Sequence, residues 1–192
     1  TVDEIKRQAR LNGFNSFHFS LSGGEPTFHP GYLDILKHLA DDVENTNYTS
    51  IHMTSNCSRP MKWFETYVEY AKPFHRASIT ASLHTEHVNT KEKMQEFADK
   101  LILCQKNDVQ ITINQVMVPE WFERDWGNAL FFHEQGINVT LKPQSDPTAS
   151  RVVEGYTQEQ LERLWNGMPQ RAFTETKRIW NNRPRPQFQI PT

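Results

Sequence analysis

Cysteine is scarce in this 192-residue chain, which contains only Cys57 and Cys104. Two thiols are too few for a disulfide framework or for a metal site made of cysteine alone. The sequence has no run of about 18 apolar residues, and its mean hydropathy is −0.71, so it predicts no transmembrane helix. The formal net charge of −2 gives no electrostatic reason to expect nucleic acid as a partner.

The N-terminal segment is polar and charged, and it lacks the apolar stretch of a secretory signal peptide. Together with two thiols that we expect to be reduced, this predicts a cytoplasmic protein. Apolar residues make up 36% of the chain and aromatic residues 11%, which is enough bulk for a hydrophobic core. Glycine and proline follow no period, which excludes collagen-like and low-complexity classes.

Short β-rich runs alternate with segments of helical apolar spacing, as is typical of βα units. Successive strands begin roughly 30 residues apart, the interval expected for parallel strands joined by crossover helices. This rhythm fits a sheet that curls toward a barrel or a doubly wound sheet. We predict strands at residues 17–23, 49–56, 77–84, 109–118 and 138–142, and helices at 1–12, 30–40, 61–71, 90–105, 120–135 and 157–166.

Every predicted strand has one apolar and one polar face; in the third, Ile79, Ala81 and Leu83 alternate with polar residues. Strands of a doubly wound sheet are apolar on both faces, and a filled eight-stranded barrel has bulky aliphatic inner layers. We therefore expect an α/β fold, a partial and open TIM-like barrel with helices outside and polar side chains around a hollow. The alternative is a sheet with one solvated face. The polar faces carry His18, Ser20 and Ser22, then His52, Thr54 and Asn56, then Ser78, Thr80, Ser82 and His84, then Gln110, Thr112 and Asn114, and finally Asn138, Thr140 and Lys142.

A Gly23-Gly24-Glu25-Pro26 turn follows the first predicted strand. Glycine permits close approach of backbone to a ligand, and proline fixes the conformation that follows. Glu25 is thereby held at the carboxyl end of a strand, where active sites of barrels and α/β sheets lie. A fixed carboxylate beside bare backbone suits the ammonium group of an amino-acid-like ligand. The alternative is a tight βα turn with a solvated glutamate.

Residues 17–30, FHFSLSGGEPTFHP, resemble the second strand and GGEP turn of radical S-adenosylmethionine (SAM) enzymes. The resemblance covers residues 1–145 and is most specific at this turn. It implies that the turn holds the amino group of SAM and that the ends of later strands contribute further contacts. The residues it assigns to SAM are Gly23, Gly24, Glu25, Pro26, Thr54, Asn56, Ser82 and Asn114, and those it assigns to substrate are His84 and Lys142.

In that family a partial barrel of six βα units holds SAM and a 4Fe–4S cluster, which cleaves SAM reductively so that the resulting radical abstracts hydrogen from substrate. Its cluster is bound by three cysteines in a C-x3-C-x2-C loop after the first strand, and this sequence contains no such loop. The resemblance therefore implies that the first βα element and its cysteines would lie before Thr1. We expect a fragment of a radical SAM enzyme, inactive as this chain, whose cluster belongs to the full-length parent only.

Two other functions remain open. One is a cluster-free, non-catalytic binding module on a degenerate radical SAM barrel. The other is a metal- or phosphate-dependent barrel enzyme in which His18, His52 and His84 converge on an ion, as imidazoles do in zinc and iron sites.

The domain boundary is expected near residue 150. Residues 1–150 would form the partial barrel core, and residues 151–192 a helix followed by a tail containing proline and arginine. If the first strand of the barrel is missing, an exposed strand edge can support self-association.

Overall fold

The computed structural model describes residues 2–149 and 151–169. The chain alternates helices and strands in the predicted order. The elements are α1 (Val2–Leu11), β1 (Ser16–Leu21), α2 (Tyr32–Ala40), β2 (Tyr48–Ser55), α3 (Met61–Ala71), β3 (Arg76–Leu83), α4 (Lys91–Lys106), β4 (Val109–Met117), α5 (Phe122–Glu134), β5 (Asn138–Pro143) and α6 (Gln158–Asn166), with short 3-10 helices at Pro26–Phe28, Val43–Asn45 and Pro119–Trp121.

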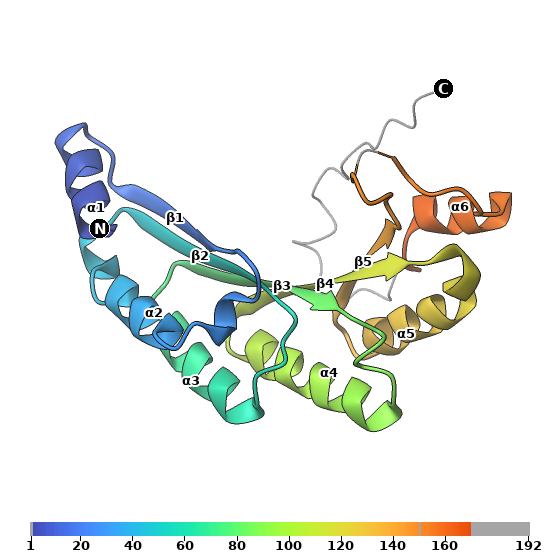
Figure 1. Ribbon diagram of the computed structural model, residues 1–192. Coiled ribbons are helices and arrows are strands. Elements are labelled where there is room, and N and C mark those ends of the chain that lie inside the picture. Colours follow the sequence, from blue (N-terminus) through green and yellow to red (C-terminus); the bar gives the residue numbers. More distant parts are fainter. Residues whose placement is uncertain (1, 150, 170–192) are drawn as a thin grey trace.

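The five strands form one parallel sheet in the order β1-β2-β3-β4-β5. Each strand thus lies beside its neighbour in sequence, with no reversal of strand order of the kind that divides a doubly wound sheet. Right-handed crossovers that always advance in one direction place their helices on the same side. Figure 1 shows α2, α3, α4 and α5 along one side of the sheet, and the doubly wound alternative is excluded.

The predicted boundaries are close to the observed ones, and the differences have local causes. β1 ends at Leu21, two residues before the predicted end, because Gly23 has a φ of 109°, outside the β region. The final helix begins after Thr157, whose side chain accepts a hydrogen bond from the Gln160 amide in a capping box.

The predicted division of each strand into two faces is confirmed. Along β3, buried and half-buried positions alternate over the whole strand. The buried face packs on the helices through side chains that are at most 1% exposed: Ile51, Met53, Ile79, Ala81 and Ile113 from the sheet, and Leu36, Phe64, Tyr67, Leu101 and Phe132 from the helices.

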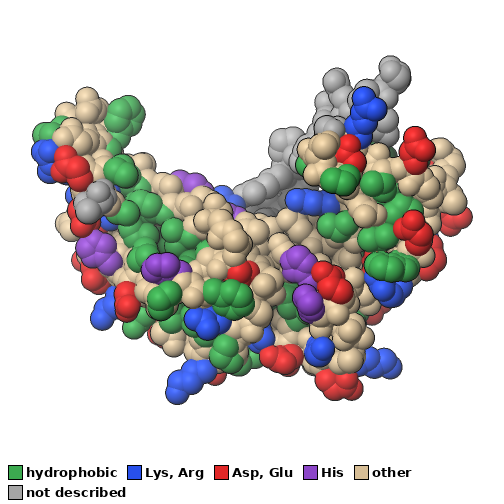
Figure 2. Space-filling model, viewed as in Figure 1, with side chains coloured by type: hydrophobic (Ala, Val, Ile, Leu, Met, Phe, Trp, Pro, Cys, Tyr) green, Lys and Arg blue, Asp and Glu red, His purple; other side chains and the backbone are tan. Residues whose placement is uncertain are grey.

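The opposite face of the sheet is hollowed, as Figure 2 shows. This arrangement is an α/β fold with an all-parallel five-stranded sheet, and it is compatible with a partial open barrel. None of the helices in residues 2–149 and 151–169 has the length and apolar character needed to cross a bilayer. The helix predicted at the start of the C-terminal region is α6, whereas the predicted tail, residues 170–192, lies outside the described residues.

Candidate functional site at the carboxyl edge of the sheet

The Gly23–Gly24 turn lies at the edge where all five parallel strands end. Gly23 and Gly24 have positive φ values of 109° and 55°, which L side chains rarely adopt, so the turn needs glycine for its backbone conformation. A Cβ added at either position would meet no atom of the described residues within 4 Å. The turn is therefore open on its outer side, and its backbone is accessible to a ligand.

The Glu25 side chain connects the glycine turn to the carboxyl end of β2 through hydrogen bonds. Its Oε1 accepts hydrogen bonds from the Thr27 hydroxyl (2.6 Å), the Ser55 hydroxyl (2.8 Å) and the Thr27 amide (3.2 Å). Its Oε2 accepts one from the Asn56 amide at 2.6 Å. Pro26 follows as the first residue of a 3-10 helix that Glu25 caps. The carboxylate thus fixes the turn and the end of β2 relative to each other.

The protonation of Glu25 follows from these bonds. Burial of the carboxyl favours its neutral form, whereas the hydrogen bonds from Asn56, Thr27 and Ser55 favour the carboxylate. The bonds prevail, so the pKa of Glu25 lies below its usual value. The carboxylate in turn adds to the effect of burial on Tyr32, and both raise the pKa of that phenol.

The loop after β2 is fixed from several directions. Ser55 Oγ accepts a hydrogen bond from the Cys57 amide (3.0 Å), and Asn56 Oδ1 accepts one from the Ser58 amide (3.0 Å). Lys100, which is 4% exposed, reaches from α4 to donate to the Cys57 carbonyl at 3.3 Å. These contacts hold the loop after β2 in the conformation in which the Asn56 amide donates to Glu25.

The residues predicted to bind SAM fall into two groups in this structure, one around the glycine turn and β2, the other on β3 and β4. Thr54 lies on the polar face and is exposed, while the Asn56 backbone is engaged with Glu25. Ser82 and Asn114 are direct register partners on the polar faces of β3 and β4. The structure thus brings Glu25 and Asn56 into contact and places Ser82 beside Asn114.

The two predicted substrate residues also lie toward this edge. Lys142 on β5 is in register with Val116 on β4, one step beyond the level of Asn114. His84 follows the last residue of β3, where its Nδ1 is 3.5 Å from a Glu86 carboxylate oxygen. His84 is therefore at the mouth of the hollow, with an acidic neighbour from its own loop.

Sequence reasoning missed four residues of this edge. Ser55 and Thr27, which are 1% and 0% exposed, bind Glu25 directly, and Arg59 donates to the Thr27 carbonyl at 3.0 Å. These contacts depend on the packing of two loops, so the strand pattern could not reveal them. Val116 is 43% exposed on an otherwise polar face, and its break in the alternation was the available signal.

Two of the three imidazoles proposed as metal ligands, those of His18 and His52, bind hydroxyl groups. His18 Nδ1 lies 2.8 Å from Ser50 Oγ, and His52 Nδ1 lies 2.9 Å from Ser78 Oγ. His84 is at the opposite end of the strands from His18. Within the described ranges, no three His, Cys, Asp or Glu side chains are grouped so that they could hold a metal ion.

The two cysteines do not fit the ligand set of an iron–sulfur cluster. Cys57 is 1% exposed and Cys104 is 0% exposed, both within the hydrophobic core. Burial raises the pKa of the Cys104 thiol to about 12 and that of Cys57 further, so neither is available as a thiolate. A 4Fe–4S cluster takes most of its ligands from thiolates, and this chain has no third cysteine.

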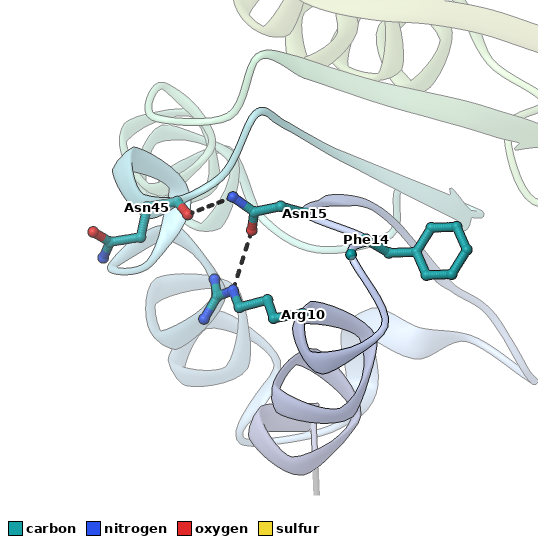
Figure 3. A pocket seen from close by; sticks show the side chains of 5 residues that line it. Arg10, Phe14, Asn15 and Asn45 are labelled. Carbon is teal, nitrogen blue, oxygen red and sulfur yellow. Dashed lines mark hydrogen bonds between the residues drawn. The ribbon is translucent and has the colours of Figure 1, made fainter.

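Another hollow lies at the amino end of β1 (Figure 3), where Arg10, Gly13, Phe14, Asn15 and Asn45 line about 450 Å³. Arg10 donates to the Asn15 amide oxygen, and Asn15 donates to the Asn45 carbonyl. Arg10 is also paired with Asp42 at 2.7 Å. The polar side chains that line this hollow thus bind one another, and few of their donors and acceptors are available to a ligand.

Comparison with known protein families found no family model that matches the chain, and comparison with curated proteins found no match.

Proposed function

We propose that this chain is the SAM-binding part of a radical SAM enzyme core, folded as a partial open barrel. The observation that carries the proposal is the Glu25 network, which presents the open Gly23–Gly24 backbone at the carboxyl edge of the sheet. The parallel sheet with sequential strand order and a hollow polar face supports the same proposal. In open parallel sheets and barrels, ligands bind at this edge.

In this proposal the glycine turn offers backbone groups to the amino group of SAM, and Glu25 is first of all a positioning residue. Oxygen Oε1 already accepts three hydrogen bonds, while Oε2 accepts one and keeps a lone pair for an ammonium donor. Ser82 and Asn114 supply hydroxyl and amide groups, and the exposed Val116 supplies an apolar surface against which a purine ring can pack.

SAM supplies an activated sulfonium, and its reductive cleavage requires an electron from a cluster. Because Cys57 and Cys104 are buried, the thiolates for that cluster have to come from outside this sequence. We therefore propose that the chain binds SAM weakly and carries out no radical chemistry alone.

The second candidate is a cluster-free binding module on the same fold, and the buried cysteines favour it. Of the aromatic residues near α5, Phe122 and Phe132 are buried in the core, while Trp121 is 55% exposed beside Arg124. Phe14, Phe28 and Trp165 are exposed elsewhere on the described surface. Such a module would keep the hollow as a binding surface and would have no requirement for SAM.

A SAM titration followed by amide NMR tests the first candidate. We expect saturable shifts at Gly23, Gly24 and Asn114 with a dissociation constant in the millimolar range, about −4 kcal/mol of binding free energy. Asn114→Ala should weaken binding. Asn47→Ala, at an exposed position just before the amino end of β2, should not. Resonances that stay unmoved at saturating SAM would overturn the proposal and leave the binding module.

Anaerobic reconstitution with iron and sulfide provides an independent check. The proposal predicts that the isolated chain acquires no visible absorbance from an iron–sulfur cluster, because its thiols are protonated and buried. A cluster bound stoichiometrically to this chain would contradict the assignment of the ligands to a segment outside it.

A further inference from the structure

A second cluster of polar groups lies in the amino-terminal half of the hollow face, away from the glycine turn. His18, Ser50 and Arg76 form one row across β1, β2 and β3, because His18 pairs with Ser50 and Ser50 with Arg76 in the parallel register. His52 occupies the next row on β2, beside Ser78. Neighbouring strands are about 4.8 Å apart, so these three cationic or cationisable side chains surround one small area.

Each of the three side chains has one nitrogen in a hydrogen bond within the protein. His18 Nδ1 binds Ser50 Oγ, and His52 Nδ1 binds Ser78 Oγ. Arg76 Nε donates to Gln110 Oε1 at 2.7 Å. The Nε2 atoms of both rings and the terminal nitrogens of the guanidinium make no hydrogen bond to any side chain or backbone group that the structure describes. The terminal guanidinium nitrogens, and Nε2 of each imidazole in its protonated form, are therefore available to donate to a ligand in the hollow.

No carboxylate of the strands balances this positive charge. The chain has 23 Asp and Glu residues, yet none stands at any strand position on the hollow face. Arg76 and Lys142 are the permanent charges there. The residues at these positions are Ser16, His18 and Ser20; Tyr48, Ser50, His52 and Thr54; Arg76, Ser78, Thr80 and Ser82; Gln110, Thr112, Asn114 and Val116; and Asn138, Thr140 and Lys142.

The neighbouring cationic groups affect the protonation of His52. Burial lowers the pKa of His52, and the positive charges of His18 and Arg76 lower it further. Arg10 provides a contrast, because its guanidinium is paired with Asp42 at 2.7 Å. A negative charge bound between Arg76 and the two imidazoles would favour the protonated form of the rings.

We propose that His18, His52 and Arg76 form a binding site for an anionic oxygen group, a phosphate or a carboxylate, on the floor of the hollow. Arg76 would contribute the permanent charge and the planar donors that oxyanions accept. The serine hydroxyls would orient the two imidazoles so that Nε2 faces the ligand. The proposal is independent of SAM binding, because it rests on different residues in a different half of the face.

The site can be tested with simple anions. We propose titrating the full chain with inorganic phosphate and, separately, with succinate, at constant ionic strength set by sodium chloride. Imidazole Cε1–H resonances of His18 and His52 report on the site directly. We expect saturable shifts in at least one titration, at concentrations up to about 20 mM for a weak single-group ligand. The stronger of the two titrations identifies the ligand as phosphate-like or carboxylate-like.

Variants separate the site from general electrostatics. Arg76→Gln should weaken anion binding at least about tenfold, the loss expected for a hydrogen-bonded charged group. His52→Gln should weaken it without removing a permanent charge. Lys62→Gln removes one charge from an exposed position of α3 on the other side of the sheet and should leave binding unchanged. Circular dichroism checks that each variant is folded.

Two results would overturn the proposal. One is a set of histidine shifts that phosphate and succinate produce only to the same extent as chloride. The other is equal binding by wild type and Arg76→Gln. If the wild-type chain binds neither anion but shows SAM shifts at Gly23 and Gly24, this site alone is refuted. If it binds an anion but shows no SAM shifts, the SAM proposal alone is refuted.

Discussion

The two halves of the hollow face use polar side chains in opposite ways. At the carboxyl edge, Glu25 accepts four hydrogen bonds from its own chain. In the amino-terminal half, His18, His52 and Arg76 each use one nitrogen and keep the others. Internally satisfied groups fix a conformation, whereas groups with unused donors can bind something else. The comparison therefore predicts large effects on stability at the edge and small ones in the cluster.

The largest effect is expected from Glu25→Ala. The substitution leaves the buried Ser55 hydroxyl and the Asn56 amide without their acceptor, and we expect a loss of about 2–4 kcal/mol in the free energy of unfolding. Urea denaturation measures it. Glu65→Ala, at an exposed position of α3, is the matched control and should change stability by less than about 0.5 kcal/mol. Similar values for both variants would contradict the positioning role of Glu25.

Gly23→Ala should have the next largest effect. No described atom blocks an added methyl group, but alanine is strained at a φ of 109°, and we expect a loss of about 1–3 kcal/mol. Gly127→Ala, within α5 and also unobstructed, should instead stabilise by about 0.5–1 kcal/mol. Thermal or urea denaturation of both variants distinguishes a conformational requirement from a general preference for glycine.

Low pH should reduce the free energy of unfolding through protonation of Glu25. Because its pKa is lower when folded than the ordinary value of 4.5, its contribution to stability is present above pH 4.5 and is lost as pH falls through the folded pKa. The stability difference between wild type and Glu25→Gln should therefore shrink below pH 4.5. A difference that stays constant down to pH 2 would show that the hydrogen bonds do not depend on the carboxylate.

The smallest effect is expected in the cluster. The folded pKa of His52 is below its ordinary value of 6.5, so stability is lost as pH falls from 6.5 through the folded pKa. At pH 7.5, Arg76→Gln should change the free energy of unfolding by less than about 0.5 kcal/mol. It should also move the pKa of His52 upward, which NMR titration detects. A large destabilisation would show that Arg76 serves the fold and not a ligand.

Much of the architecture was predictable because its signals are local. Alternating residues such as Ile79, Ala81 and Leu83 identify a strand and its buried face from a few consecutive positions. The Gly23–Gly24 turn was recognisable from its residue types, and the structure gives both residues positive φ. The exposed Val116 was also visible as an interruption of the pattern, although its significance was not evident.

The sequence by itself determined the strands, their two faces and the conformation of the glycine turn, since each depends on the preferences of neighbouring residues. Only the tertiary structure decided that Glu25 meets the Asn56 amide, 31 positions away, and that Ser50 stands between His18 and Arg76. Those meetings depend on the register of parallel strands, which is set by how crossover helices pack against the sheet. No periodicity within one segment contains that information.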